Sequence, residues 1–133
     1  MNTKIIMTSS ALTLGTVGIT LTFIPETILN LLTINSNEAS LFMMQIVGAL
    51  FFAFGMLNWM TKSSVIGGIY NRPIAIANFT HFLIAGLALS KGLIANPKLP
   101  FMIWVIGGIY FIFMILFGTI LFRHPTTETE LKS

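Results

Sequence analysis

Charged residues are scarce in this chain of 133 residues, and aspartate is missing altogether. Only 8% of the residues are charged and 55% are hydrophobic, whereas soluble domains are roughly 25% charged and roughly 45–50% apolar. The seven basic residues are scattered, so the net charge of +3 does not indicate a nucleic-acid partner. The composition therefore predicts a protein whose main solvent is not water.

Cysteine is also absent, which excludes disulfide bonds, thiol nucleophiles, thioether-linked haem and sites where cysteine binds zinc or an iron–sulfur cluster. The two histidines are fewer than the three protein ligands of a catalytic zinc site. All four glutamates lie outside the apolar stretches, which leaves no acid–base pair at membrane depth. We therefore expect no catalytic residue, no bound metal and no cofactor, in a protein that is not an enzyme on its own.

Four predominantly apolar stretches have the length of a transmembrane helix, because a hydrocarbon core of roughly 30 Å needs about 20 such residues. They cover residues 5–24, 41–60, 74–95 and 101–122. No small-x-small cleavage site follows the first stretch, so we expect it to stay in the protein rather than act as a signal peptide. Its many small residues favour close contact with another helix. The sequence predicts a single all-α domain over residues 1–133, an integral membrane bundle of four antiparallel helices.

The segments outside these spans complete the predicted topology. Residues 96–100 contain two prolines and are so short that the third and fourth spans are expected to be antiparallel neighbours. Residues 25–34 begin with Pro25 and are mostly apolar, which predicts a short helix at the membrane interface. Residues 124–133 are mainly polar and form a predicted cytoplasmic tail.

The basic residues near the ends of the spans predict the orientation, because cytoplasmic loops of membrane proteins are enriched in lysine and arginine. Two basic residues fall on one side of the predicted bundle, Lys91 and Lys98. Five fall on the other side, namely Lys4, Lys62, Arg72, Arg123 and Lys132. Both termini and the loop between the second and third spans are therefore expected in the cytoplasm.

Five polar residues lie within the spans at depths where a side chain facing lipid is costly, namely Gln45, Asn58, Asn78, Thr80 and His81. Such residues often mark functional sites. With a rise of about 1.5 Å per residue, Asn58 lies about 6 Å inside Lys62 and Asn78 about 7.5 Å inside Pro73. His81 follows Asn78 by three residues, which places both on one side of the third span. We predict a polar cluster of Asn58, Asn78 and His81. His81 is expected to point into the bundle and to form a hydrogen bond with a polar group of another helix or with a ligand, and Asn58 is the first expected partner.

Three residues near the predicted cytoplasmic ends of these spans are candidates to cover the cluster from the interface, namely Trp59, Tyr70 and Arg72. Arg72 would also offer a cationic group to a lipid phosphate or to an anionic head group. The simplest interpretation of the cluster is hydrogen bonding between helices. A ligand-binding site and a proton pathway are the alternatives, and the sequence leaves all three open.

The two middle spans resemble a known group of proteins. The stretch from about Met44 to Leu93 contains Gly48-Ala49-Leu50, Asn58-Trp59, Lys62, Gly67-Gly68-Ile69-Tyr70-Asn71-Arg72-Pro73 and Asn78-Phe79-Thr80-His81-Phe82. In these features the chain is similar to small four-span bacterial membrane proteins of the DoxX-like group. The resemblance implies a compact four-helix bundle, sometimes an accessory membrane subunit of a redox or stress system. It supplies no catalytic residue, and the lack of cysteine argues against a direct thiol-redox role.

These observations predict a small non-enzymatic protein of the bacterial cytoplasmic (inner) membrane that binds a lipid-like ligand or acts as an accessory subunit of a membrane complex. Its expected partners are the lipid bilayer, a lipid-like ligand, and another membrane protein or further copies of the chain. One alternative is an oligomeric channel or transporter for a small solute, since four spans alone rarely enclose a pore. Another is a membrane enzyme that acts on a lipid or a quinone.

Overall fold

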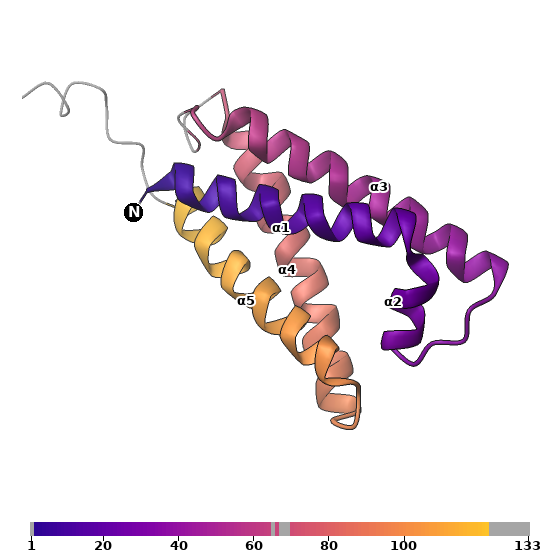
Figure 1. The fold of residues 1–133 in the computed structure, drawn as a ribbon. Coiled ribbons are helices and arrows are strands. Elements are labelled where there is room, and N and C mark those ends of the chain that lie inside the picture. Colours follow the sequence, from indigo (N-terminus) through magenta and orange to yellow (C-terminus); the bar gives the residue numbers. More distant parts are fainter. Residues whose placement is uncertain (1, 65, 67–69, 123–133) are drawn as a thin grey trace, which may run out of the picture.

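A computed structural model describes residues 2–64, 66 and 70–122, and the regular elements in that part of the chain are α-helices. In chain order they are α1 (Thr3–Phe23), α2 (Pro25–Leu31), α3 (Glu38–Thr61), α4 (Arg72–Ala95) and α5 (Phe101–Phe122), as Figure 1 shows. Four of them are long and apolar enough to cross a membrane, so the predicted number of long apolar helices is confirmed. The short helix expected within residues 25–34 is α2, whereas the predicted tail lies outside the described residues.

Local sequence explains where several helices begin. The Asn2 side chain accepts a hydrogen bond from the Lys4 backbone N–H at 3.1 Å and caps α1. Asn37 and Ser40 form a capping box at the start of α3, in which each side chain accepts from the backbone N–H of the other at 2.8 and 2.9 Å. Pro25 is the first residue of α2, where a backbone N–H would have no helical partner. These residues fix the starts of α1, α2 and α3.

Helices α1 and α3 pack against each other at backbone distance. A Cβ added to Gly18 would lie 2.5 Å from the backbone N of Phe52 and 2.7 Å from the carbonyl oxygen of Gly48. A Cβ added to Gly55 would lie 2.7 Å from the backbone N of Gly15. Small residues permit such contacts between membrane helices. The close contact predicted from the small residues of the first span is therefore confirmed.

Helices α4 and α5 pack through aromatic side chains. Phe82 of α4 is fully buried, and its ring stacks on Phe113 and Phe117 of α5 at centroid distances of 5.0 and 5.6 Å. Gly118 of α5 makes room for Phe79, whose Cε2 would be 3.2 Å from a Cβ added to that glycine. The prediction that the third and fourth spans are neighbours is confirmed.

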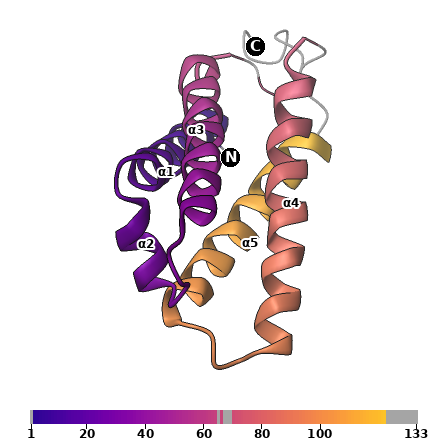
Figure 2. The same ribbon diagram turned by 90° about the vertical axis from the view of Figure 1, so that its right-hand side faces the viewer.

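The two helix pairs, α1 with α3 and α4 with α5, are arranged as a wedge (Figures 1 and 2). They lie close together near the start of α1, the end of α3 and the start of α4, which we call the closed end. They diverge toward α2 and the connection from α4 to α5, which we call the open end. Ile6 and Met7 of α1 belong to the same buried cluster as Phe117 and Ile120 of α5, so apolar packing joins the pairs at the closed end.

Candidate functional site

Asn58 of α3 and Asn78 of α4 meet at the closed end, as their depth in the sequence predicts. The Asn78 Nδ2 group donates to Asn58 Oδ1 at 2.8 Å, and Asn58 Nδ2 donates to Asn78 Oδ1 at 2.7 Å. Asn58 Nδ2 also donates to Ser10 Oγ of α1 at 3.0 Å. Ser10, Asn58 and Asn78 are all fully buried. This amide cluster therefore links three helices.

The N–H donors of the amide cluster are fully used. An amide NH2 group has two donors, and the second donor of Asn78 goes to the Ile74 carbonyl oxygen at 3.0 Å. The Ser10 hydroxyl donates to the Met7 carbonyl oxygen at 3.0 Å. A ligand that accepts hydrogen bonds would have to break one of these bonds in an apolar environment, so the geometry favours the role of holding helices together. Ser10 belongs to the amide cluster although it is not among the predicted residues. Its hydroxyl group lies at a depth in the first span comparable to that of Asn58 and Asn78, and this depth could have indicated it.

His81 lies outside the amide cluster, so Asn58 is the wrong partner, although the predicted hydrogen bond to a polar group of another helix is present. The His81 ring packs against Phe51 and Phe54 of α3, with centroid distances of 5.4 and 5.3 Å. Its hydrogen-bond partner is Tyr110 of α5, whose Oη lies 3.4 Å from His81 Nε2. The physical reason is angular: with about 100° of turn per helical residue, two side chains three positions apart point roughly 60° away from each other. Depth along a helix does not give this direction.

Trp59, Tyr70 and Arg72, predicted to cover the polar cluster, lie at the surface instead. The Trp59 ring is 45% exposed, and the Lys62 ammonium nitrogen lies 2.9 Å from its centroid in a cation–π contact. Tyr70 is 95% exposed, and Arg72 is exposed as the first residue of α4. Because the helices already bury the amide cluster completely, these three side chains are not needed to shield it.

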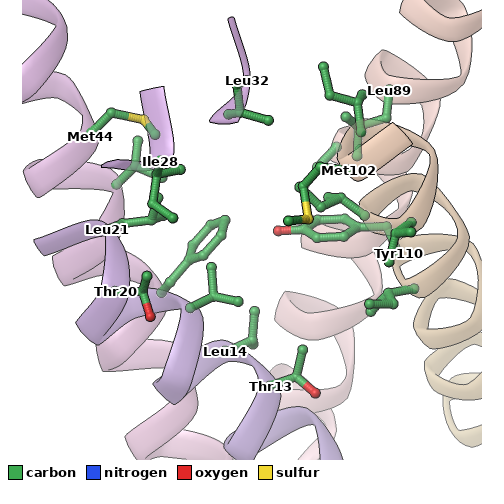
Figure 3. A pocket seen from close by; sticks show the side chains of 18 of the residues that line it. Thr13, Leu14, Thr20, Leu21, Ile28, Leu32, Met44, Leu89, Met102 and Tyr110 are labelled. Carbon is green, nitrogen blue, oxygen red and sulfur yellow. The ribbon is translucent and has the colours of Figure 1, made fainter. Parts of the chain in front are cut away.

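A large apolar cavity of about 790 Å³ lies between the two helix pairs. All five helices contribute to its wall, and Figure 3 shows the side chains that point into it. Representative lining residues are Leu14, Leu21, Ile28, Met44, Leu89 and Met102. The cavity exists because the pairs diverge, so that facing apolar side chains do not meet.

Hydrogen-bonding side chains are rare in the cavity wall and are limited to Tyr110 and three threonines of α1. Thr13 Oγ1 donates to the Ser9 carbonyl oxygen at 2.9 Å, and Thr20 Oγ1 donates to the Thr16 carbonyl oxygen at 2.8 Å. The described residues that line the cavity include none with a charge. The wall is therefore close to a pure hydrocarbon surface.

The cavity is closed on one side and accessible on the other. Leu14 and Phe82 form part of its wall and are 1% and 0% exposed. Val17, Leu31 and Met102 also line it, and they are 38%, 51% and 43% exposed. A molecule can therefore enter from the surroundings of the protein and reach a buried wall.

The six residues predicted as a ligand site do not line this cavity. Among these six residues, His81 contacts the wall of the cavity, through the lining residues Phe51, Phe82 and Tyr110. A weak signal in the sequence is the spacing of Thr13, Thr16 and Thr20, which repeats on one side of the first span. The described residues include no group of three His, Asp or Glu side chains that could hold a metal ion.

A scan against protein-family models, a search of curated proteins and a search of solved structures each found no match for this chain.

Proposed function

We propose that this protein is a non-enzymatic membrane protein that binds a lipid-like ligand in the cavity between its two helix pairs. The observation that carries this proposal is the cavity itself, with a volume of about 790 Å³ and a wall drawn from all five helices. Ligand pockets measure roughly 300–1,000 Å³ and are lined mainly by hydrophobic and aromatic side chains. Both the size and the lining of this cavity fit that description.

The chemistry of the wall selects the class of ligand. An ion or a sugar would exchange its hydrogen bonds with water for contacts with leucine, methionine and phenylalanine side chains, which is costly without polar partners. A long hydrocarbon chain loses no hydrogen bonds there and fills the space with dispersion contacts. The cavity thus supports binding of an acyl or isoprenoid chain better than passage of a small polar solute.

We further propose that the four long helices form a compact bundle, as a membership of the DoxX-like group would imply, and that this bundle lies in the bacterial cytoplasmic membrane with its closed end toward the cytoplasm. The distribution of basic residues supports this orientation. Lys4, Lys62 and Arg72 belong to the closed end, and Lys91 and Lys98 lie toward the open end. The cavity would then open in the half of the bilayer away from the cytoplasm.

Labelling of introduced cysteines tests the orientation, because the chain has no cysteine of its own. Ser64 is exposed just after α3, at the closed end, and Lys98 is exposed at the open end. In spheroplasts treated with a membrane-impermeant maleimide, Lys98→Cys is expected to react and Ser64→Cys is expected to stay unlabelled until the membrane is permeabilised. The reverse pattern would refute the orientation.

Filling the cavity tests the proposed site. Gly92 lines the cavity, and a Cβ added there meets no atom within 4 Å, so Gly92→Leu should place its side chain in the cavity without straining the helix. The variant is expected to bind decylpyrene, an uncharged chain probe, about tenfold more weakly, since crowding a packed site costs roughly 1–3 kcal/mol. Probe fluorescence with purified protein in micelles measures the affinity, and native mass spectrometry counts lipid that stays bound.

Gly108→Leu is the matched control for Gly92→Leu. Gly108 is also a helical glycine with no atom within 4 Å of an added Cβ, but it is exposed and does not line the cavity. Its variant should bind decylpyrene as the parent does. Equal affinity of all three proteins, or weakening only in the Gly108 variant, would show that the chain binds elsewhere.

A further inference from the structure

Tyr110 is the most deeply buried hydrogen-bonding side chain in the cavity wall. It is only 7% exposed although it lines the cavity. Figure 3 shows its hydroxyl group directed from α5 into the cavity. A buried hydroxyl that points into an otherwise apolar space is a group that a ligand can use to orient itself.

The Tyr110 hydroxyl is only weakly engaged within the protein. Its partner among the described residues is His81 Nε2 at 3.4 Å, which is long compared with the roughly 2.5–3.0 Å of a good hydroxyl hydrogen bond to oxygen. A phenolic hydroxyl can donate one hydrogen bond and accept others. The hydroxyls of Thr13 and Thr20 differ, because they donate to carbonyl oxygens of their own helix at 2.9 and 2.8 Å. Tyr110 therefore retains capacity for a partner in the cavity.

Neighbouring rings hold the Tyr110 side chain in place. The Phe82 ring packs against it edge to face with a centroid distance of 5.2 Å, and the His81 ring lies 5.5 Å away. A side chain fixed in this way loses little freedom when a ligand binds. The Tyr110 hydroxyl is thus preorganised at one position of the cavity wall before a ligand binds.

The ligand group that meets this hydroxyl must be uncharged. The described cations of the chain, Lys4, Lys62, Arg72, Lys91 and Lys98, are not among the lining residues. A carboxylate or a phosphate beside Tyr110 would therefore be buried without an opposite charge, which is strongly unfavourable. A carbonyl or hydroxyl oxygen has no such cost once it accepts a hydrogen bond.

We infer, on the basis of the proposed function, that the ligand is an uncharged long-chain lipid whose carbonyl or hydroxyl oxygen accepts a hydrogen bond from Tyr110. Its chain runs along the apolar wall toward α2 at the open end. The hydroxyl of Tyr110 gives this oxygen-bearing chain an advantage over a plain hydrocarbon of equal length. Binding of the hydrocarbon part depends on the rest of the wall and not on the hydroxyl.

Competition between two matched chains tests this inference. Displacement of decylpyrene by 2-heptadecanone and by heptadecane is measured for the purified full-length protein in micelles, at equal mole fractions in the micelle. The parent is expected to bind the ketone about fivefold more tightly, the factor that one net hydrogen bond contributes. Tyr110→Phe, which removes only the hydroxyl, should abolish this preference and leave the affinity for heptadecane unchanged. Thr20→Val, which removes a wall hydroxyl bonded to its own helix, should keep the preference.

The possible results distinguish a failure of the role of Tyr110 from a failure of chain binding in the cavity, on which that role rests. If the parent binds neither chain, the cavity proposal fails as well. If it binds both equally, or if Tyr110→Phe keeps the preference, the chain site stands and the role of Tyr110 is refuted.

Infrared spectra of 2-heptadecanone labelled with ¹³C at the carbonyl give a check on the parent alone. A lowered carbonyl frequency relative to the ketone in heptadecane is expected, and an unshifted band would overturn the inference.

Discussion

Gly18→Ala is expected to destabilise the protein by roughly 1–3 kcal/mol, the usual cost of overpacking. The added methyl group would lie 2.5 Å from the backbone N of Phe52 and 2.7 Å from the carbonyl oxygen of Gly48. Both atoms belong to the backbone of α3 and cannot turn aside, so α1 and α3 must separate along their contact. The free energy of unfolding can be measured by titrating micelles of the protein with sodium dodecyl sulfate and following helix content.

Gly15→Ala serves as the control for this variant, because it lies in the same helix and a Cβ added there meets no atom within 4 Å. Its free energy of unfolding should be unchanged or raised by up to about 1 kcal/mol, since alanine favours a helix more than glycine does. If Gly18→Ala proved as stable as Gly15→Ala, the backbone contact between α1 and α3 would not be the one described.

Asn58→Leu is expected to lower the free energy of unfolding by about 1–3 kcal/mol. Asn58 takes part in three hydrogen bonds, two with Asn78 and one with Ser10, and bonds between membrane helices contribute roughly 0.6 kcal/mol each and at most about 1.7. Leucine has a similar size, so the change removes polar contacts with little change in packing. The same titration in sodium dodecyl sulfate measures the loss.

A double variant tells whether the loss comes from the reciprocal amide bonds. A buried polar group left without a partner costs more than removing both partners together. Asn58→Leu with Asn78→Leu should therefore recover at least half of the stability lost by Asn58→Leu alone. Gln45→Leu is a useful comparison, because the exposed Gln45 side chain donates to the Thr22 carbonyl oxygen only at 3.5 Å and should matter little. Strictly additive losses at Asn58 and Asn78 would contradict the coupling.

The long helices could be predicted from the sequence because hydropathy is a local property. An apolar stretch must reach about 20 residues to cross a hydrocarbon core, and each such stretch became one helix. The helix ends differ by a few residues because capping depends on side chains outside the apolar run. The predicted second span begins at residue 41, for example, whereas α3 begins at Glu38, directly after the capping residue Asn37.

The candidate site was predictable only in part, because depth along a helix is a single coordinate. Depth was enough for Asn58 and Asn78, whose complementary amide groups satisfy each other once the helices are adjacent. It was not enough for His81, whose direction around α4 takes it to Tyr110. Glycines of α3 such as Gly48 gave no hint of their partners, since a glycine does not indicate which backbone will approach it.

The cavity could not be predicted from the sequence, for a different reason. Its volume depends on the angle between two helix pairs, and that angle is set by contacts between the pairs, such as the contact of Phe51 with His81. Leu89 and Met102 face the cavity, yet as apolar residues within spans they do not differ in kind from residues that face lipid. Only the three-dimensional arrangement of the helices distinguishes residues that face the cavity from residues that face lipid.

The wedge has a mechanical consequence, because the buried amide hydrogen bonds that join its two helix pairs lie at one end. The hydrogen bonds that tie Ser10, Asn58 and Asn78 together act as a pivot. As with any lever, a small rotation about a pivot moves nearby atoms little and distant atoms much. A tilt too small to break the amide bonds would still change the spacing between α2 and the start of α5. Such a tilt would change the width of the cavity while the pivot stays intact.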